Sequence, residues 1–495
     1  MILAIDQGTT GTTCLLFDGD GRVRGRAYRE FGQHFPRPGW VEHDPSEIWD
    51  VTRVVAHEAL VSADVTASSL RAVGITNQRE TVVVWDERTG LPLHNAIVWQ
   101  DRRTAARCDT LRRQGLEDIV RQRTGLVVDP YFSATKIEWL LANVEGLRER
   151  AAQGGVRFGT IDAWLAYNLT GRTVTDYSNA SRTMLFDIAA LEWSEELCDA
   201  LGVPVAALPE AAPSAAVLGE TDPDAFHGAR VPVSGMAGDQ QAALFGQACL
   251  EPGLGKNTYG TGSFVLQNAG SQLPPVRDGL LNTVAWGIGD RVDYAVEASV
   301  FVTGAAVQWL RDGLGIIREA ADTEGLAASL DSNEGVYFVP ALTGLGSPHW
   351  DPYARGTLTG LTRGAGRAHL ARAALEAMAY QTVDAVRAME DASGVVLEEL
   401  KADGGAVVNG WLMKFQADVL GVPVVVPEVS ETTALGAAYL AGVATGTWTE
   451  DDVGTMWRQA ARYEPSMSED TREELIAGWR RALERARSNE AERSG

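Results

Sequence analysis

Residues 1–18 read MILAIDQGTTGTTCLLFD, an apolar run, a Gly-Thr-Thr turn and a second apolar run, which is the pattern of two strands joined by a turn. The pattern returns at residues 256–270, KNTYGTGSFVLQNAG, around Gly260. In each stretch, glycine allows backbone N–H groups and threonine hydroxyls to face oxyanions. One such hairpin is also an ordinary structural turn. The pair, with Asp6 near the end of the first strand, predicts a two-lobed nucleotide-binding enzyme.

The length of 495 residues exceeds what one core usually organises, so we expect two domains with a ligand site in the cleft between them. An alanine-rich run gives way to glycine and proline in AALFGQACLEPGLGKNT. We therefore place the boundary near residue 250, which predicts domains 1–250 and 251–495. Strand-like and helical runs alternate in both, and this indicates an α/β fold.

The formal charge of -23 argues against nucleic acid or an anionic membrane surface as a partner. It does not argue against ATP, because Mg²⁺ and backbone donors can neutralise phosphates in an acidic protein. No apolar stretch approaches the roughly 20 residues that span a bilayer, and no signal-peptide pattern opens the chain. The four scattered cysteines suit reduced thiols. These features predict a cytoplasmic protein without an integral membrane segment.

Several familiar motifs are not met. PGLGKNT is similar to a P-loop, but Leu250 stands where the first glycine belongs and Asn257 replaces Ser or Thr. No Gly-x-Gly-x-x-Gly lies between a strand and a helix, and no His, Glu or Cys cluster has metal-ligand spacing. The sequence therefore favours neither a Walker A site, a dinucleotide fold nor zinc chemistry.

The segment ITNQRETVVVW puts Arg79 and Glu80 together where one predicted strand ends and the next begins. Glu80 accepts hydrogen bonds and Arg79 donates them from a rigid fork, which suits a small polyol whose oxygens both donate and accept. The alternative is a solvated surface ion pair.

The segment SGMAGDQQAALFG places Asp239 at the start of a predicted helix, just before the proposed boundary and the second hairpin. A carboxylate there can accept a hydroxyl proton while a phosphoryl group arrives. The alternative is a helix N-cap without a catalytic role.

Glycine and aromatic positions give weaker signals. ADGGAVVNG joins a strand end to a helix near Asn409, so a base or ribose could lie on the backbone at Gly405, although a simple Gly-Gly turn has the same pattern. Gly304 and Gln308 share one predicted helix face, and helix packing would explain Gly304 equally well. Trp99, Tyr131 and Phe264 are by default core aromatics.

Helix signals are clearest at two places. Asp44 as N-cap and Pro45 as first residue predict a helix start. Leu475, Trp479 and Leu483 fall on one stripe of a C-terminal helix, which we expect to dock on the protein.

The ordered motifs DQGTTG, PGWVEHDP, GITNQRET, NAIVWQDRR, TGLVVDPYFS, TDYSNASRTMLFD, GDQQAALFGQ, KNTYGTGSF and DGGAVVN resemble those of the FGGY carbohydrate kinases across nearly the whole chain. The combination of WVEHDP and NQRET resembles the motifs of the members that act on glycerol, rather than those of members that act on pentuloses or gluconate. The resemblance implies two actin-like (ribonuclease H-like) domains, an interdomain catalytic cleft, and transfer of phosphate from ATP with Mg²⁺ to glycerol, giving sn-glycerol 3-phosphate. It assigns polyol and phosphate binding to the first domain and nucleotide binding to the second.

The resemblance also implies roles residue by residue. Asp239 matches the general base, with Gln240 beside it on the polyol. Arg79, Glu80 and Tyr131 match contacts to the glycerol hydroxyls, and Trp99 and Phe264 match the aromatic walls. The phosphate and nucleotide positions are Thr9, Thr10 and Gly11 in the first hairpin, Thr261 in the second, and Gly304, Gln308, Gly405 and Asn409. Asp6 matches the anchor for Mg²⁺.

One position departs from the family, because Thr13 stands where many members carry Arg. We retain Thr13 as a phosphate contact through its hydroxyl. We expect a homo-oligomer, a dimer or a tetramer. The alternatives are a kinase of the same fold for another sugar, an actin-like filament or chaperone ATPase, and a non-catalytic relative; Asp239 argues against the last, and the Arg79-Glu80 pair against the filament or chaperone.

Overall fold

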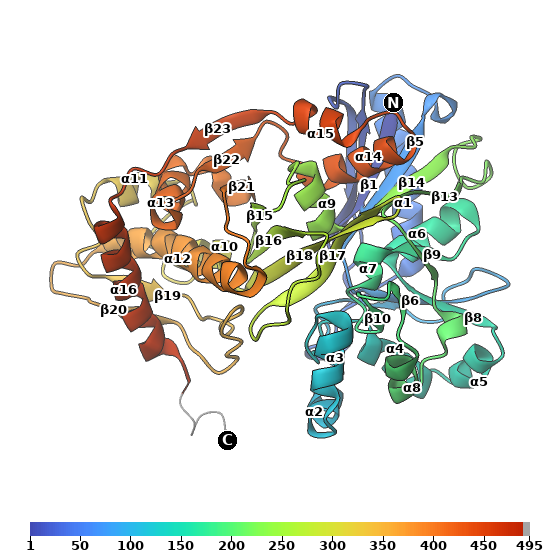
Figure 1. Ribbon diagram of the computed structural model, residues 1–495, viewed down its shortest axis with the longest axis horizontal. Helices are drawn as coiled ribbons and strands as arrows, with labels where there is room; N and C mark the ends of the chain where they lie inside the picture. The colour runs from blue at the N-terminus through green and yellow to red at the C-terminus, as the bar shows by residue number, and fades with distance from the viewer. Residues whose placement is uncertain (489–495) are drawn as a thin grey trace.

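The computed structural model describes residues 1–488. Strands and helices alternate along the chain, and most of the strands form one large mixed sheet with helices packed against it (Figure 1). This sheet has 13 strands in the order β23-β22-β21-β15-β16-β18-β17-β13-β14-β5-β1-β2-β3. Its strands are β1 (Ile2–Gln7), β2 (Gly11–Phe17), β3 (Val23–Glu30), β5 (Ala72–Asn77), β13 (Ala215–Glu220), β14 (Pro232–Gly238), β15 (Leu254–Tyr259), β16 (Ser263–Gly270), β17 (Leu281–Ile288), β18 (Arg291–Val300), β21 (Glu399–Gly404), β22 (Val424–Pro427) and β23 (Gln459–Tyr463). The predicted α/β fold is confirmed.

The sheet has two halves with the same strand arrangement: the first contains β1, β2, β3, β5, β13 and β14, and the second contains β15, β16, β17, β18, β21, β22 and β23. The strand β1 pairs antiparallel with β2 and parallel with β5, and β15 pairs antiparallel with β16 and parallel with β21. The two predicted hairpins are therefore confirmed, each opening one half. The halves join where β13 meets β17 at the single pair Ala215 and Ile288.

A second, four-stranded sheet stands beside the first half. It contains β4 (Glu42–His43), β7 (Ala96–Ile97), β6 (Val82–Asp86) and β8 (Val156–Thr160), in that order. The chain leaves β5 of the large sheet and enters β6 of the small sheet through residues 78–81. Arg79 and Glu80 thus lie in the crossing between two sheets.

Helices cover both sheets. Asp44 caps α1 by accepting a hydrogen bond from the Ser46 N–H at 2.8 Å, and Pro45 is the first helical residue, as the sequence predicts. The helices of the first half are α1 (Pro45–Ser62), α2 (Ala105–Arg113), α3 (Leu116–Thr124), α4 (Ala134–Asn143), α5 (Leu147–Ala152), α6 (Ile161–Thr170), α7 (Tyr177–Ala180), α8 (Glu195–Leu201) and α9 (Asp239–Gly246). Those of the second half are α10 (Gly304–Asp312), α11 (Asp322–Ala328), α12 (Arg367–Ser393), α13 (Gly410–Leu420), α14 (Thr432–Ala444), α15 (Glu450–Met456) and α16 (Glu469–Ala486). No helix within residues 1–488 is long and apolar enough to cross a bilayer.

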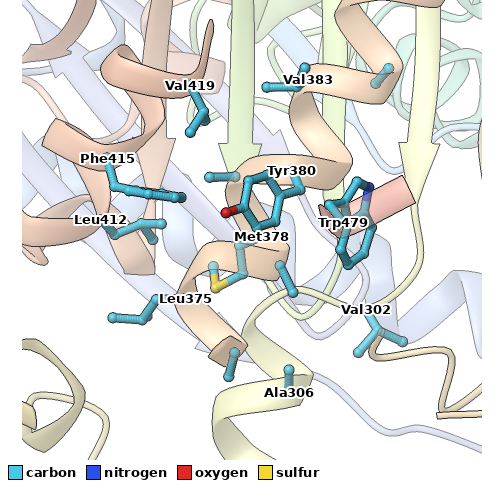
Figure 2. Close-up of a cluster of buried hydrophobic side chains, with 14 of the residues drawn as sticks. Val302, Ala306, Leu375, Met378, Tyr380, Val383, Leu412, Phe415, Val419 and Trp479 are labelled. Atoms are coloured by element: carbon cyan, nitrogen blue, oxygen red, sulfur yellow. The ribbon is translucent and has the colours of Figure 1, made fainter. Parts of the chain in front are cut away.

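The core of the second half forms around α12 (Figure 2). Tyr380 stacks on Trp479 with ring centroids 5.4 Å apart, and Phe415 meets Tyr380 edge-on at 5.6 Å. Trp479 and Leu483 are buried and Leu475 is partly buried, so the predicted docking of the C-terminal helix α16 is confirmed. Aromatic pairs of this kind add about 0.5–1.5 kcal/mol beyond area burial.

The helix α14 follows the predicted boundary in sequence but packs against the first half, beside β1, β5 and α9 (Figure 1). The two helices approach backbone to backbone, because a Cβ on Gly436 would collide with the Ala242 carbonyl and one on Gly246 with the Thr432 carbonyl. The boundary near residue 250 remains a proposal, with α14 as a segment that crosses back.

Candidate active site

The carboxyl ends of three parallel strands lie side by side. Gln7 of β1 pairs with Asn77 of β5, and Asn77 pairs with Gly238 of β14. The residues that follow are 8–10, 78–80 and 239–240, which include the predicted phosphate, polyol and base positions. Ligands of open α/β sheets bind at this edge. The register therefore places these predicted positions at one edge of the sheet.

Arg79 lies at the centre of a buried ion cluster. Its Nε is 3.1 Å from Asp239 Oδ1, and its Nη1 and Nη2 donate to Glu297 Oε2 at 2.6 Å and Oε1 at 3.1 Å. The side chains of Arg79 and Glu297 are 2% and 0% exposed, whereas that of Asp239 is 33% exposed. The surface ion pair is thus the wrong alternative, and Asp239 is the member of this cluster that an incoming molecule can reach.

Glu80 belongs to the same cluster through Arg182, whose Nε donates to Glu80 Oε1 at 2.7 Å. Arg182 Nη2 also donates to Glu297 Oε1 at 3.1 Å. Burial raises the pKa of Glu80, an effect that the two arginines oppose. Burial also acts to raise the pKa of Glu297, but Arg182 and Arg79 outweigh it and lower that pKa to about 2.

Asp239 is the first residue of α9, and Gly238 occupies the N-cap position. Asp239 is therefore not the N-cap residue that the alternative predicted. Its carboxylate nevertheless lies at the positive end of the helix dipole. Asp239 Oδ1 accepts a hydrogen bond from the Gln240 N–H at 2.7 Å. Gln240 is in turn held by Lys256, whose Nζ donates to Gln240 Oε1 and, at 2.9 Å, to Thr258 Oγ1.

Two of the three predicted aromatic residues lie together. Trp99 donates from Nε1 to Thr9 Oγ1 at 3.0 Å, and Tyr131 meets the Trp99 ring edge-on at 5.5 Å. Burial raises the pKa of the Tyr131 hydroxyl, which keeps it a neutral hydrogen-bonding group. Phe264 lies on β16 opposite Thr258 and packs on an apolar cluster shared by both halves.

The turn of the second hairpin contacts Gly304, a predicted nucleotide position, and lies beside Gly404, the residue before the predicted Gly405. The Gly304 N–H donates to the Gly260 carbonyl at 3.1 Å, and Gly404 pairs with Tyr259 beside the turn. A Cβ on Gly304 would meet the Gly260 oxygen at 2.5 Å, so packing explains that glycine. Gly405 has no packing reason, because a Cβ there would meet no atom of residues 1–488 within 4 Å. Thr261 is exposed at the same turn.

The remaining predicted positions lie in the first hairpin, on α10 and at the N-cap of α13. Asn409 caps α13, since its Oδ1 accepts from the Leu412 N–H at 2.9 Å, and its Nδ2 donates to Thr323 Oγ1 at 3.3 Å. Gln308 is exposed on α10, and Thr10 is exposed in the first turn. Thr13 lies opposite Asp6 in the first hairpin. Gly11 has a packing reason, because a Cβ would meet the Arg29 carbonyl at 2.5 Å.

Three charged residues of this site were not identified from the sequence: Arg182, Lys256 and Glu297. Burial lowers the pKa of Lys256 to about 8, although the Asp403 and Asp239 carboxylates act in the opposite direction. One sequence signal could have indicated Glu297: it is a charged residue inside an apolar stretch, YAVEASV. A charged residue in a buried strand needs a partner.

The surroundings of Asp6 fit a magnesium ion that arrives with phosphates. Burial raises the pKa of Asp6 to about 7, and the Asp239 and Glu431 carboxylates add to this. Residues 1–488 contain no group of three or more His, Cys, Asp or Glu side chains that could hold a metal by themselves. Mg²⁺ suits such a place, because it is usually bound by one or two carboxylates, several waters and the phosphates of a substrate.

Comparisons with known proteins agree over the whole length. Two family models match: the FGGY family of carbohydrate kinases, N-terminal domain, at residues 1–246, and its C-terminal domain at residues 255–445. Glycerol kinase from Carboxydothermus hydrogenoformans is 57% identical over 494 residues, covering 99% of both chains. Glycerol kinase from Symbiobacterium thermophilum is 58% identical with the same coverage.

Solved structures give the same picture. A crystal structure of Plasmodium falciparum glycerol kinase with ADP superposes with a TM-score of 0.93 at 33% identity, covering 99% of this chain and 98% of the other. Xylulose kinase from Rhodospirillum rubrum superposes with a TM-score of 0.87 at 26% identity, covering 98% of both chains.

Proposed function

Since this chain belongs to the FGGY family of carbohydrate kinases, we propose that it transfers the terminal phosphoryl group of ATP to glycerol, giving sn-glycerol 3-phosphate. The observation that carries the proposal is the reachable Asp239 carboxylate, held by Arg79 at the carboxyl ends of three parallel strands. The actin-like (ribonuclease H-like) fold supplies the two phosphate hairpins.

In this proposal Asp239 accepts the proton of a glycerol hydroxyl. The oxygen then bonds to the terminal phosphorus of ATP, the bond from that phosphorus to the bridging oxygen breaks, and ADP leaves. Arg79, Glu80, Tyr131 and Gln240 bind the hydroxyls, and Trp99 and Phe264 contact the carbon chain. Buried and rigid groups hold the acceptor in line, and such positioning provides much of the rate enhancement.

The phosphates would lie against the two hairpins, at Thr9, Thr10, Gly11 and Thr13 in the first and at Thr261 in the second. The nucleotide would lie at Gly304, Gln308, Gly405 and Asn409. Asp6 would hold Mg²⁺, which neutralises phosphate charge when bound. The domains 1–250 and 251–495, a cytoplasmic location and a dimer or tetramer complete the proposal.

The acceptor decides between glycerol and another sugar of the same family. An assay of ADP release with glycerol, dihydroxyacetone, xylulose and gluconate should give the highest kcat/KM with glycerol. A preference for xylulose or gluconate would replace the proposed substrate. ATP hydrolysis that no polyol stimulates, together with nucleotide-dependent assembly, would favour a filament-type ATPase instead.

The pKa of Lys256 predicts a pH dependence. Below about pH 8 Lys256 is charged, and above it the side chain loses the charge that offsets Asp239 and Asp403. We expect kcat/KM for glycerol to fall as pH rises through about 8, because this parameter reports the free enzyme. In Lys256→Arg the fall should move to higher pH, since Arg stays protonated. Profiles from pH 6 to 10 that coincide in shape would remove Lys256 as the cause.

A further inference from the structure

We propose that Glu297 is a positioning residue, which fixes the guanidinium of Arg79 and thereby sets the affinity of the enzyme for its polyol without touching it. The inference rests on the proposed function, in which Arg79 binds glycerol. It concerns a residue of the second half that acts on a site in the first half.

Glu297 controls which edge of Arg79 remains available. A guanidinium has five N–H donors in a fixed plane. Three of them are used here, two on Glu297 Oε2 and Oε1 and one on Gln241 Oε1 at 3.2 Å. Within residues 1–488, the Nε–H and one Nη2–H make no hydrogen bond, and Nε is the atom that faces Asp239 at 3.1 Å. The two-point contact with Glu297 therefore leaves the Nε edge of Arg79 facing Asp239.

The backbone around each residue indicates that Glu297 positions Arg79, and not the reverse. Glu297 lies in the middle of β18, where it pairs with Leu266 of β16 on one side and Leu281 of β17 on the other. Arg79 lies in the crossing between β5 and β6, outside any strand. A carboxylate held between two paired strands is the more rigid partner. Arg182 Nη2 donates at 3.1 Å to Oε1 of the same carboxylate, the oxygen that also accepts from Arg79 Nη2, and so holds Glu297 as well.

A purely structural role is the competing explanation. Buried ion pairs are weak evidence for stability, because desolvation offsets much of their attraction. Such a role would change the melting temperature and leave the binding of glycerol unchanged. The chain offers a matched control, since Glu376 is also a buried carboxylate, bonded to Arg372 Nε at 2.7 Å and to Asn333 Nδ2 at 2.9 Å, and to none of the site residues.

The test compares Glu297→Gln with Glu376→Gln in the full-length enzyme. We expect Glu297→Gln to raise KM for glycerol roughly tenfold or more, as for loss of a buried charge partner, with KM for ATP unchanged. Glu297→Asp, which keeps the charge, should recover part of the loss. In an Arg79→Gln background, Glu297→Gln should add no further increase, because the residue through which it acts is already lost. Glu376→Gln should lower the melting temperature only.

Two results would overturn the proposal: wild-type KM for glycerol in folded Glu297→Gln, or the same fold-increase with and without Arg79. If Glu297→Gln does not fold, Glu297→Asp decides alone, since a wild-type KM despite the shortened carboxylate contradicts positioning. If the wild-type enzyme prefers another polyol, the proposed substrate is wrong, and the same comparison on that acceptor still tests Glu297.

Discussion

Replacing Asp239 by Asn is expected to lower kcat by about 10²- to 10⁴-fold, which is the usual contribution of a positioned general base. The amide cannot accept the hydroxyl proton, yet it has nearly the same size and can still accept a hydrogen bond from the Gln240 N–H. The pair with Arg79 is weakened but the arginine keeps Glu297. The variant should therefore fold and bind ATP as the wild-type enzyme does.

Steady-state kinetics and a separate measurement of ADP binding check this prediction. Glu195→Gln is a suitable control, because Glu195 is likewise the first residue of a helix, α8, and is exposed. It tests whether an acidic residue at a helix start matters in general. Near-normal turnover of Asp239→Asn would remove Asp239 from the chemistry, whereas lost ADP binding would point to a disturbed fold.

Replacing Arg79 by Ala is expected to damage both stability and recognition of the polyol. Breaking a buried ion pair by removing one partner costs about 3–5 kcal/mol. Glu297 and Glu80 keep Arg182 as a partner, which softens the loss. For kcat/KM with glycerol, truncating a buried charge partner costs about 2–5 kcal/mol, or about 30- to 5,000-fold. KM for ATP should change little.

Denaturant unfolding and kinetics measure the two effects separately. Arg372→Ala provides the control, since it also removes the buried arginine partner of a buried glutamate, Glu376, but outside the site. It should lose stability and keep its KM for glycerol. Unchanged kcat and KM for glycerol in folded Arg79→Ala would refute the role of Arg79 in binding.

Local signals predicted much of this fold. Both hairpins and the start of α1 were predictable because turn glycines, an Asp cap and an N-terminal Pro act over a few residues. Asp239 and Arg79 could be identified for the same reason, since each closely follows the end of a strand. Their roles in substrate binding and catalysis remain proposals.

Other features could not be predicted, because they depend on distant parts of the chain. Arg79 and Glu297 are separated by 218 positions, and Glu80 and Arg182 by 102. No local pattern could pair them. The glycines are ambiguous for a different reason. The sequence predicts Gly11 and Gly304 as phosphate and nucleotide positions, yet each also has a neighbour that leaves no room for a Cβ. A pattern of glycines does not separate the two causes.

The glycine contact between α9 and α14 ties a segment late in the chain to the helix that begins with Asp239. Because Gly246 and Gly436 bring the two backbones together, a side chain at either position would force the helices apart. Asp239 is in the first turn of α9, about two turns from Gly246. A substitution that separates the two helices would therefore disturb the helix that carries Asp239.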